Sequence, residues 1–199
     1  MRDIFGRMPV RMRQYVRHVL AVPGVLSAGS SGDNIVLKGK GSNLMTIFVH
    51  ETAHSMDSHA IPGTSVPFHN SSPWLEAVNQ DSAICDSYAQ TSQGENFAQE
   101  TVVALFDKVV PGGIGSVQPG WSQIFHQYAT AQFWLGNQIL PGGRCEKRLT
   151  NSAPVSMGPA TGHRAVVKAR SAPDVSLSPD VEVIEPIPMG KFSFNTFDE

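Results

Sequence analysis

The sequence predicts an α+β fold in which a small sheet precedes a predominantly helical second half. The first observation is a short β-type run, Asn34 to Lys38, which is set between turns rich in serine and glycine. The second is a series of longer stretches with apolar residues at helical spacing, several of which end at a Pro-Gly pair. The third is the segment His50-Glu51-Thr52-Ala53-His54, in which two histidines stand one helical turn apart.

The apolar periodicity gives the order of the expected helices. An amphipathic helix is expected over residues 7–20, before the Pro23-Gly24 pair. The next helix is expected from residue 44 to about residue 56, and it carries both histidines. Residues 57–73 have the composition of a loop. Further helices are expected over residues 73–88, 97–109 and 121–140.

A change of composition near residue 150 divides the chain. Residues 1–150 contain the periodic elements, and we expect them to form one domain. Residues 151–199 contain six prolines among scattered serine and valine residues, with no helical period. We therefore expect residues 151–199 to be an extended or disordered tail.

Composition and charge exclude several classes of partner. The chain has 199 residues and a formal net charge of -2, with no dense block of lysine and arginine, so we expect no nucleic-acid partner. No apolar run reaches the length that a membrane span needs, so we expect no membrane partner. The start of the chain lacks the pattern of a signal peptide, which indicates a cytoplasmic protein or a sequence that begins downstream of the natural start.

The segment His50 to His54 matches the HExxH pattern of zinc enzymes. On a helix both imidazoles lie on one face and can bind one zinc ion, while Glu51 points at the water on the metal. The alternative is a solvated helix that happens to carry histidine and glutamate. A catalytic zinc needs a third protein ligand and leaves one position open to water.

The residues that follow do not supply the third ligand of two well-known patterns. The metzincin pattern needs glycine and histidine where this chain has Asp57 and Ala60, and the aspzincin element begins at Gly63-Thr64 but lacks its acid. Asp57 lies one turn past His54 and could orient a ligand histidine from the outer shell.

The HExxH segment, Ser87-Tyr88 and Glu95-Asn96-Phe97-Ala98 together resemble the catalytic domain of the anthrax lethal-factor-type gluzincins, over roughly residues 44–106. This resemblance implies a zincin-like fold for residues 1–150. It also implies that Glu95 is the third zinc ligand and that Tyr88 faces the metal. The family often has an acid where this chain has Gln99, which weakens the expected outer-shell support of the metal.

The chain as a whole resembles the fungal conidiation-specific protein 13 family, a group of secreted metallopeptidase-like proteins. The segments that carry this resemblance are His50 to Asp57, Tyr88 to Thr91, Asn96 to Gln99, Leu105 to Gly113 and Phe125 to Thr130. The secreted location that this resemblance implies favours a disulfide between Cys85 and Cys145. The alternative is that they are two unrelated buried thiols. The resemblance thus implies an extracellular location, with a cytoplasmic one as the alternative.

Each assigned residue also has a plainer interpretation. Glu95 could close a capping box with Ser92, and Tyr88 could be an ordinary half-buried residue. His126 stands among aromatic residues and is expected in the core, and His69 is given no role.

The sequence predicts a zinc-dependent metallopeptidase that acts on a protein or peptide substrate. Glu51 serves as general base, Tyr88 donates a hydrogen bond to the oxyanion, and the strand near Ile35–Leu37 offers an edge to an extended peptide. The alternative function is a catalytically inactive, secreted metallopeptidase-like domain that binds zinc or a partner. The sequence leaves the oligomeric state open.

Overall fold

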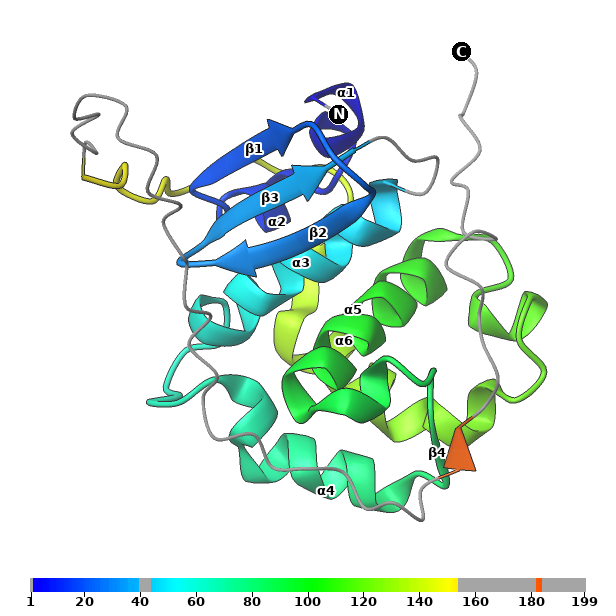
Figure 1. Ribbon diagram of the computed structural model, residues 1–199. Helices are drawn as coiled ribbons and strands as arrows, with labels where there is room; N and C mark the ends of the chain where they lie inside the picture. The colour runs from blue at the N-terminus through cyan, green and yellow to red at the C-terminus, as the bar shows by residue number, and fades with distance from the viewer. Residues whose placement is uncertain (1, 40–43, 154–181, 184–199) are drawn as a thin grey trace.

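A three-stranded sheet forms one layer of the molecule (Figure 1). The computed structural model describes residues 2–39, 44–153 and 182–183. The strands are β1 (His18–Val22), β2 (Ser27–Ser31) and β3 (Asn34–Lys38), in the order β1-β3-β2. The turn between β2 and β3 has positive φ angles at Gly32 and Asp33, 54° and 64°, as a tight hairpin of type I′ requires. The predicted strand over residues 34–38 is confirmed, and so is the mixed α+β class.

β3 is the central strand, which corrects the expectation that it offers a free edge. It pairs in parallel with β1 and antiparallel with β2, so both of its backbone edges are occupied. Ile35 and Leu37 point toward the core and are almost fully buried. A peptide therefore cannot add to β3, and in the described part of the chain the outer edges of the sheet belong to β1 and β2.

The predicted helix over residues 7–20 is wrong. Two short helices, α1 (Arg2–Gly6) and α2 (Val10–Arg13), stand on either side of Pro9, which has no N–H group to continue a helix. The residues that follow α2 enter β1 instead, where Val19 lies opposite Ile35. The pairing with β3 gives backbone hydrogen bonds to a segment rich in β-branched residues, and it outweighs the weak helical period.

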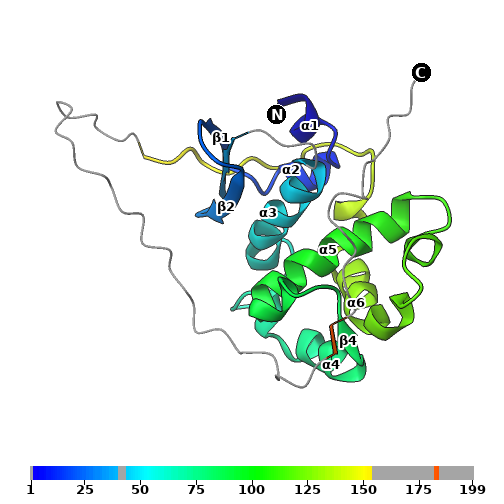
Figure 2. The ribbon, with the colours of Figure 1, turned by 45° about the vertical axis from the view of Figure 1, so that its right-hand side comes forward.

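Helix α3 (Leu44–His59) lies between the sheet and helix α5 (Gln93–Val109), as Figure 2 shows. It packs against β2 and β3 on one side and against α5 on the other. Helix α6 (Phe125–Leu135) covers a further side of α5, and α4 (Ser72–Gln80) packs against α6. The two expected helices around residues 44–56 and 97–109 are thus confirmed, each somewhat longer than predicted.

The predicted helix over residues 73–88 ends early. After α4, the carboxylate of Asp81 accepts hydrogen bonds from the backbone N–H groups of His126 and Gln127, at 3.0 and 2.8 Å. Asp81, which lies outside α6, thus caps the start of that helix. The chain then continues as the short strand β4 (Ala83–Ile84). β4 pairs in parallel with β5 (Glu182–Val183).

The remaining elements are short 3-10 helices that connect the others. They are η1 (Phe68–Asn70), η2 (Ala89–Thr91), η3 (Ile114–Ser116), η4 (Trp121–Ile124) and η5 (Gly136–Ile139). The predicted helix over residues 121–140 is therefore three elements, η4, α6 and η5. Gly136, with a φ of 51°, interrupts it in a conformation that favours glycine.

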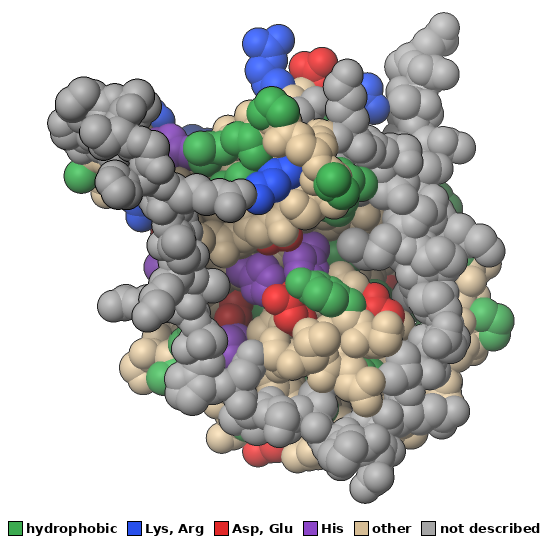
Figure 3. Space-filling model, in the orientation of Figure 1, with side chains coloured by type: hydrophobic (Ala, Val, Ile, Leu, Met, Phe, Trp, Pro, Cys, Tyr) green, Lys and Arg blue, Asp and Glu red, His purple; other side chains and the backbone are tan. Residues whose placement is uncertain are grey.

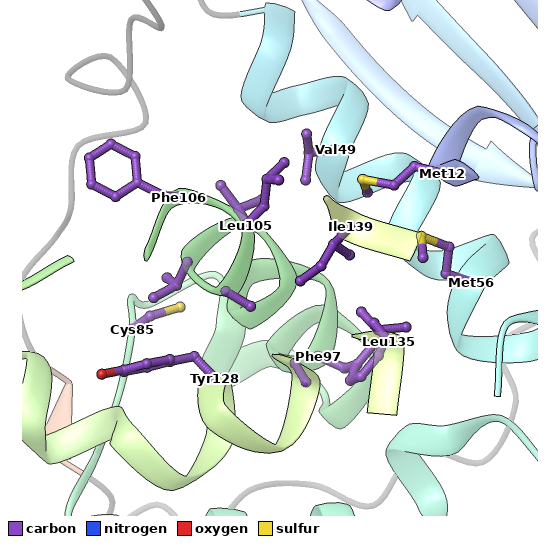
Figure 4. Close-up of a cluster of buried hydrophobic side chains, with 14 of the residues drawn as sticks. Met12, Val49, Met56, Cys85, Phe97, Leu105, Phe106, Tyr128, Leu135 and Ile139 are labelled. Atoms are coloured by element: carbon purple, nitrogen blue, oxygen red, sulfur yellow. The ribbon is translucent and has the colours of Figure 1, made fainter. Parts of the chain in front are cut away.

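The main apolar cluster lies where α2, α3, α5 and η5 meet (Figure 4). Among its members are Met12, Val49, Met56, Leu105 and Ile139, which come from these four elements and are almost fully buried. This packing fixes α3 against α5. The facing positions of these two helices are therefore rigidly paired, which matters for the polar residues along the same contact.

The predicted tail over residues 151–199 lies outside the described residues, apart from residues 151–153 and the two residues of β5. No helix within the described residues has both the length and the apolar character to cross a membrane.

Candidate metal centre

Three side chains meet where α3 faces the first turn of α5. His50 and His54 come from α3 at a spacing of one turn, and Glu95 comes from α5. In Figure 3, histidine and acidic side chains gather in a recess at the middle of one face of the molecule, below the sheet. The side chains of His54 and Glu95 are 26% and 25% exposed, so the group can be reached from solvent.

The three facing atoms have the separations of ligands around one metal ion. Oε2 of Glu95 lies 2.9 Å from Nε2 of His50 and 3.4 Å from Nε2 of His54, and the two Nε2 atoms are 3.3 Å apart. Ligands at about 2.0–2.1 Å from a tetrahedral zinc ion lie about 3.3 Å from one another. The structure thus brings Glu95 next to the two histidines, where the resemblance implied it, and two imidazoles with one carboxylate are a donor set that suits zinc.

The hydrogen-bond arrangement leaves lone pairs facing the centre of the site, where a cation would stabilise them. Nδ1 of His50 lies 2.9 Å from the acceptor Oε1 of Gln99, so Nδ1 carries the proton and Nε2 presents its lone pair. Oε2 of Glu95 is buried and has no hydrogen-bond donor when both Nε2 atoms are unprotonated. Three lone pairs then face one another, and only a proton or a metal ion between them relieves the repulsion.

In the metal-free protein the histidines act on Glu95. Burial alone raises the pKa of Glu95, but hydrogen bonds to His50 and His54 and the electrostatic attraction of the two histidines outweigh burial. The pKa of Glu95 therefore lies well below its ordinary value, and this carboxylate stays ionised.

Glu51 and Tyr88 have shifted pKa values as well. Burial raises the pKa of Glu51 to about 7, while the charge of His54 opposes the shift and that of Glu95 adds to it. Burial, together with the charges of Glu95 and Glu51, raises the pKa of Tyr88 to about 12. The Tyr88 ring lies 5.6 Å from the His50 ring, and the residue is half exposed just before η2. Tyr88 thus remains a hydrogen-bond donor at neutral pH.

Gln99 supports the site more strongly than the sequence suggested. Its carbonyl oxygen accepts a hydrogen bond from Nδ1 of His50, and its amide nitrogen donates one to Oδ2 of Asp86. The chain Asp86–Gln99–His50 orients the imidazole much as a carboxylate does when it contacts a ligand histidine directly. Sequence reasoning missed Asp86, which is brought to Gln99 only by the turn after β4.

Among the described residues, the Asp57 carboxylate hydrogen-bonds to His69 and to neither His50 nor His54, which corrects the expectation for this residue. Its carboxylate instead holds His69, with 2.6 Å between Oδ2 and Nδ1 and 2.8 Å between Oδ1 and the backbone nitrogen. The sequence assigns no role to His69, because in the sequence this residue has no partner at metal-ligand spacing, and Asp57 is brought to it only by the fold.

Glu95 does not close a capping box. Oγ of Ser92 does accept a hydrogen bond from the backbone nitrogen of Glu95, at 3.1 Å, so Ser92 caps α5 as the plainer interpretation supposed. The Glu95 carboxylate, however, faces the two histidines. One residue serves the cap with its backbone and the site with its side chain.

Two further expectations are wrong. Cys85 and Cys145 are free thiols, the first buried and the second exposed, so the predicted disulfide is absent and lends no support to secretion. His126 is not a core residue, because its side chain is 45% exposed and pairs with Asp81 at 2.7 Å.

Comparison with known proteins assigns the chain to a family. The family model described as conidiation-specific protein Con-13 matches residues 1–191. The chain belongs to the Con-13 family. It is similar to conidiation-specific protein 13 of Neurospora crassa, with 29% identity over 174 residues, which cover 82% of this chain and 49% of that relative. This Con-13 chain thus spans about half the length of the curated relative that it matches, and neither description names a metal or a reaction.

Proposed function

We propose that this member of the Con-13 family is a zinc-dependent metallopeptidase with a zincin-like fold of the gluzincin type. His50, His54 and Glu95 are the proposed zinc ligands. The observation that carries the proposal is the set of three separations, 2.9, 3.3 and 3.4 Å, between the facing ligand atoms of His50, His54 and Glu95. A structural zinc site would have four protein ligands, whereas three ligands leave a position for the reaction.

The chain's own residues have the properties that peptide hydrolysis needs. A zinc ion at this position would supply a Lewis acid that activates water and polarises the scissile carbonyl. Glu51, next to His50 on α3, takes a proton from the attacking water and returns it to the leaving amine. Tyr88 keeps its proton at neutral pH and donates a hydrogen bond to the oxygen on which negative charge develops.

The substrate is proposed to be a peptide in extended conformation that pairs with the outer edge of β2. β2 pairs with β3 on one side, and among the described residues it has no strand on the other. It is also an edge strand that packs against α3, the helix of the two histidines. Its residues Ser27 to Ser31 have small side chains, which leave the backbone groups open to a peptide.

The test is a set of single substitutions measured on a broad peptide library. Glu51→Gln should keep the fold and the bound zinc but abolish cleavage, because the shape of the side chain remains and the base is lost. Tyr88→Phe should keep zinc and lose about a hundredfold or more in kcat, with little change in KM. A wild-type protein that binds one zinc ion per chain but cleaves no peptide in the library would support the catalytically inactive, zinc-binding alternative instead.

A further inference from the structure

Asp57 and His69 form a buried pair beside the proposed metal centre. One carboxylate holds one histidine twice, through the ring at 2.6 Å and through the backbone nitrogen at 2.8 Å. Both residues are less than one-tenth exposed. An ionised carboxylate only accepts hydrogen bonds, so Nδ1 of His69 carries a proton and the ring has one fixed orientation.

The His69 ring rests against the first turn of α5. A Cβ atom placed on Gly94 would lie 3.5 Å from Cε1 of His69, an ordinary van der Waals contact. On its other side the ring is held by Asn70, whose amide nitrogen lies 2.9 Å from Nε2. The ring is thus fixed at both nitrogens, and it lies beside Gly94, the residue immediately before Glu95.

The three residues before Glu95 each have a different neighbour. Ser92 caps the helix through the backbone nitrogen of Glu95, and the indole nitrogen of Trp74 donates to Oε1 of Gln93 at 2.9 Å. Gly94 lies beside the His69 ring, which any side chain at that position would meet at van der Waals distance. Of these three neighbours, His69 is the one held by α3, because its partner Asp57 stands on α3 at the spacing that follows His50 and His54 on one helical face.

We propose that Asp57 and His69 are positioning residues that set the distance between α3 and the first turn of α5, and thereby hold Glu95 against both imidazoles. This inference rests on the proposed zinc site, because the position of Glu95 matters only when a metal ion is bound. Outer-shell residues that fix a ligand affect metal affinity by about 10- to 100-fold. A pair that only stabilises the fold would have no effect on zinc affinity in the folded protein.

The molecule contains a matched control. Asp81 and His126 are a second Asp–His pair with the same two contacts, 2.7 Å from Oδ1 to the ring and 3.0 Å to the backbone nitrogen, at the start of α6. This pair contacts none of the proposed zinc ligands among the described residues. Replacing His69 or His126 by glutamine removes the same kind of interaction in the two places.

The experiment measures zinc dissociation constants by competition with a chromophoric chelator, on full-length protein at equal folded fraction. His69→Gln should weaken zinc binding by about 10- to 100-fold, whereas His126→Gln should leave it unchanged. In metal-free protein, His69→Gln should also speed amide hydrogen exchange in the first turn of α5. Asp57→Asn, which keeps the size of the side chain, should give the same loss of affinity and serves if His69→Gln does not fold.

The outcomes separate the two proposals. A wild-type protein that binds no zinc overturns the proposed function and this inference with it. A wild-type protein that binds zinc, with His69→Gln or Asp57→Asn folded and unchanged in affinity, overturns only the positioning role. An equal loss of affinity in His126→Gln also overturns it, because the effect would then be general to the fold.

Discussion

Glu95 and Glu100 are two carboxylates on one helix, α5, and their surroundings shift their pKa values in opposite directions. Glu95 faces His50 and His54, and its pKa is lowered although its burial alone would raise it. Glu100 is fully buried, and its carboxylate faces the thiol of Cys85, which is a weak hydrogen-bond donor. Burial raises the pKa of Glu100 well above its ordinary value, and the negative charge of Asp81 adds to the shift.

The comparison shows that burial alone does not make a site for a cation. Burial penalises the charge on both residues, but the two histidines beside Glu95 outweigh this penalty, whereas the weak Cys85 donor beside Glu100 does not. For Glu95 the charge is useful, because a divalent cation would bind to it. For Glu100 the neutral, protonated form is the stable one, and we assign this residue to the interior of the fold and not to the metal centre.

The largest expected difference between the two residues concerns zinc. Glu95→Ala deletes a proposed ligand and should weaken zinc binding by more than about 100-fold, since even outer-shell losses reach that size. Glu100→Gln should leave zinc affinity unchanged. Both are measured by competition with a chelator, and a loss of affinity in Glu100→Gln would mean that the two carboxylates belong to one coupled site.

The second difference concerns the pH dependence of stability. Because the pKa of Glu100 is raised in the folded state, the folded protein holds this proton at pH values where the unfolded chain has lost it. Stability from this group is therefore full below the unfolded value of about 4.5 and falls as pH rises toward the raised folded value. The slope is at most about 1.4 kcal/mol per pH unit.

The matched variant for this effect is Glu100→Gln, which cannot ionise. Its amide can donate to Oδ1 of Asn96, a buried acceptor one turn away that has no partner among the described residues. Urea unfolding of metal-free protein from pH 5 upward should show wild type losing stability relative to Glu100→Gln. Glu51 titrates with the same sign in both proteins and cancels in the difference. Parallel curves for the two proteins would mean that Glu100 is ionised in the fold.

The smallest expected effect is at Cys145, which is exposed and unbridged. Cys145→Ser should change the free energy of unfolding by less than about 0.5 kcal/mol, as for a typical surface substitution. Loss of a native disulfide would instead cost about 2–5 kcal/mol. In wild type, a thiol reagent should label Cys145 in the native state and both cysteines after denaturation without reductant. If neither cysteine were labelled after denaturation without reductant, the two would be joined by a disulfide, contrary to this prediction.

Local patterns predicted the parts of the molecule that depend on short-range spacing. The strand over residues 34–38 and the helix with His50 and His54 have periods that a single segment reveals. The prediction of a helix over residues 7–20 was wrong because β1 depends on pairing with β3, which lies some 16 residues further along the chain. The predicted helix over residues 73–88 ends early because Asp81 caps α6, which is distant in sequence, and does not continue α4.

In the candidate site, too, the residues that could be predicted are those with a recognisable local pattern. The HExxH spacing identifies His50, Glu51 and His54, and the family resemblance places Glu95 opposite them. Asp86 and His69 were not predicted, since they reach the site through loops whose paths are set by tertiary contacts. Gln99 was expected to weaken the site because it is not an acid. Its amide, which both accepts and donates, makes it a link to Asp86.

The most direct test of the metal centre is the zinc X-ray absorption spectrum of protein loaded with one equivalent of zinc. The expected spectrum shows only nitrogen and oxygen ligands at about 2.0–2.1 Å, with the outer-shell scattering of two imidazoles. Glu95→Ala should change the first shell, and His69→Gln should increase its disorder. A protein that takes up no zinc, or a spectrum with sulfur at about 2.3 Å, would contradict a centre built from His50, His54 and Glu95.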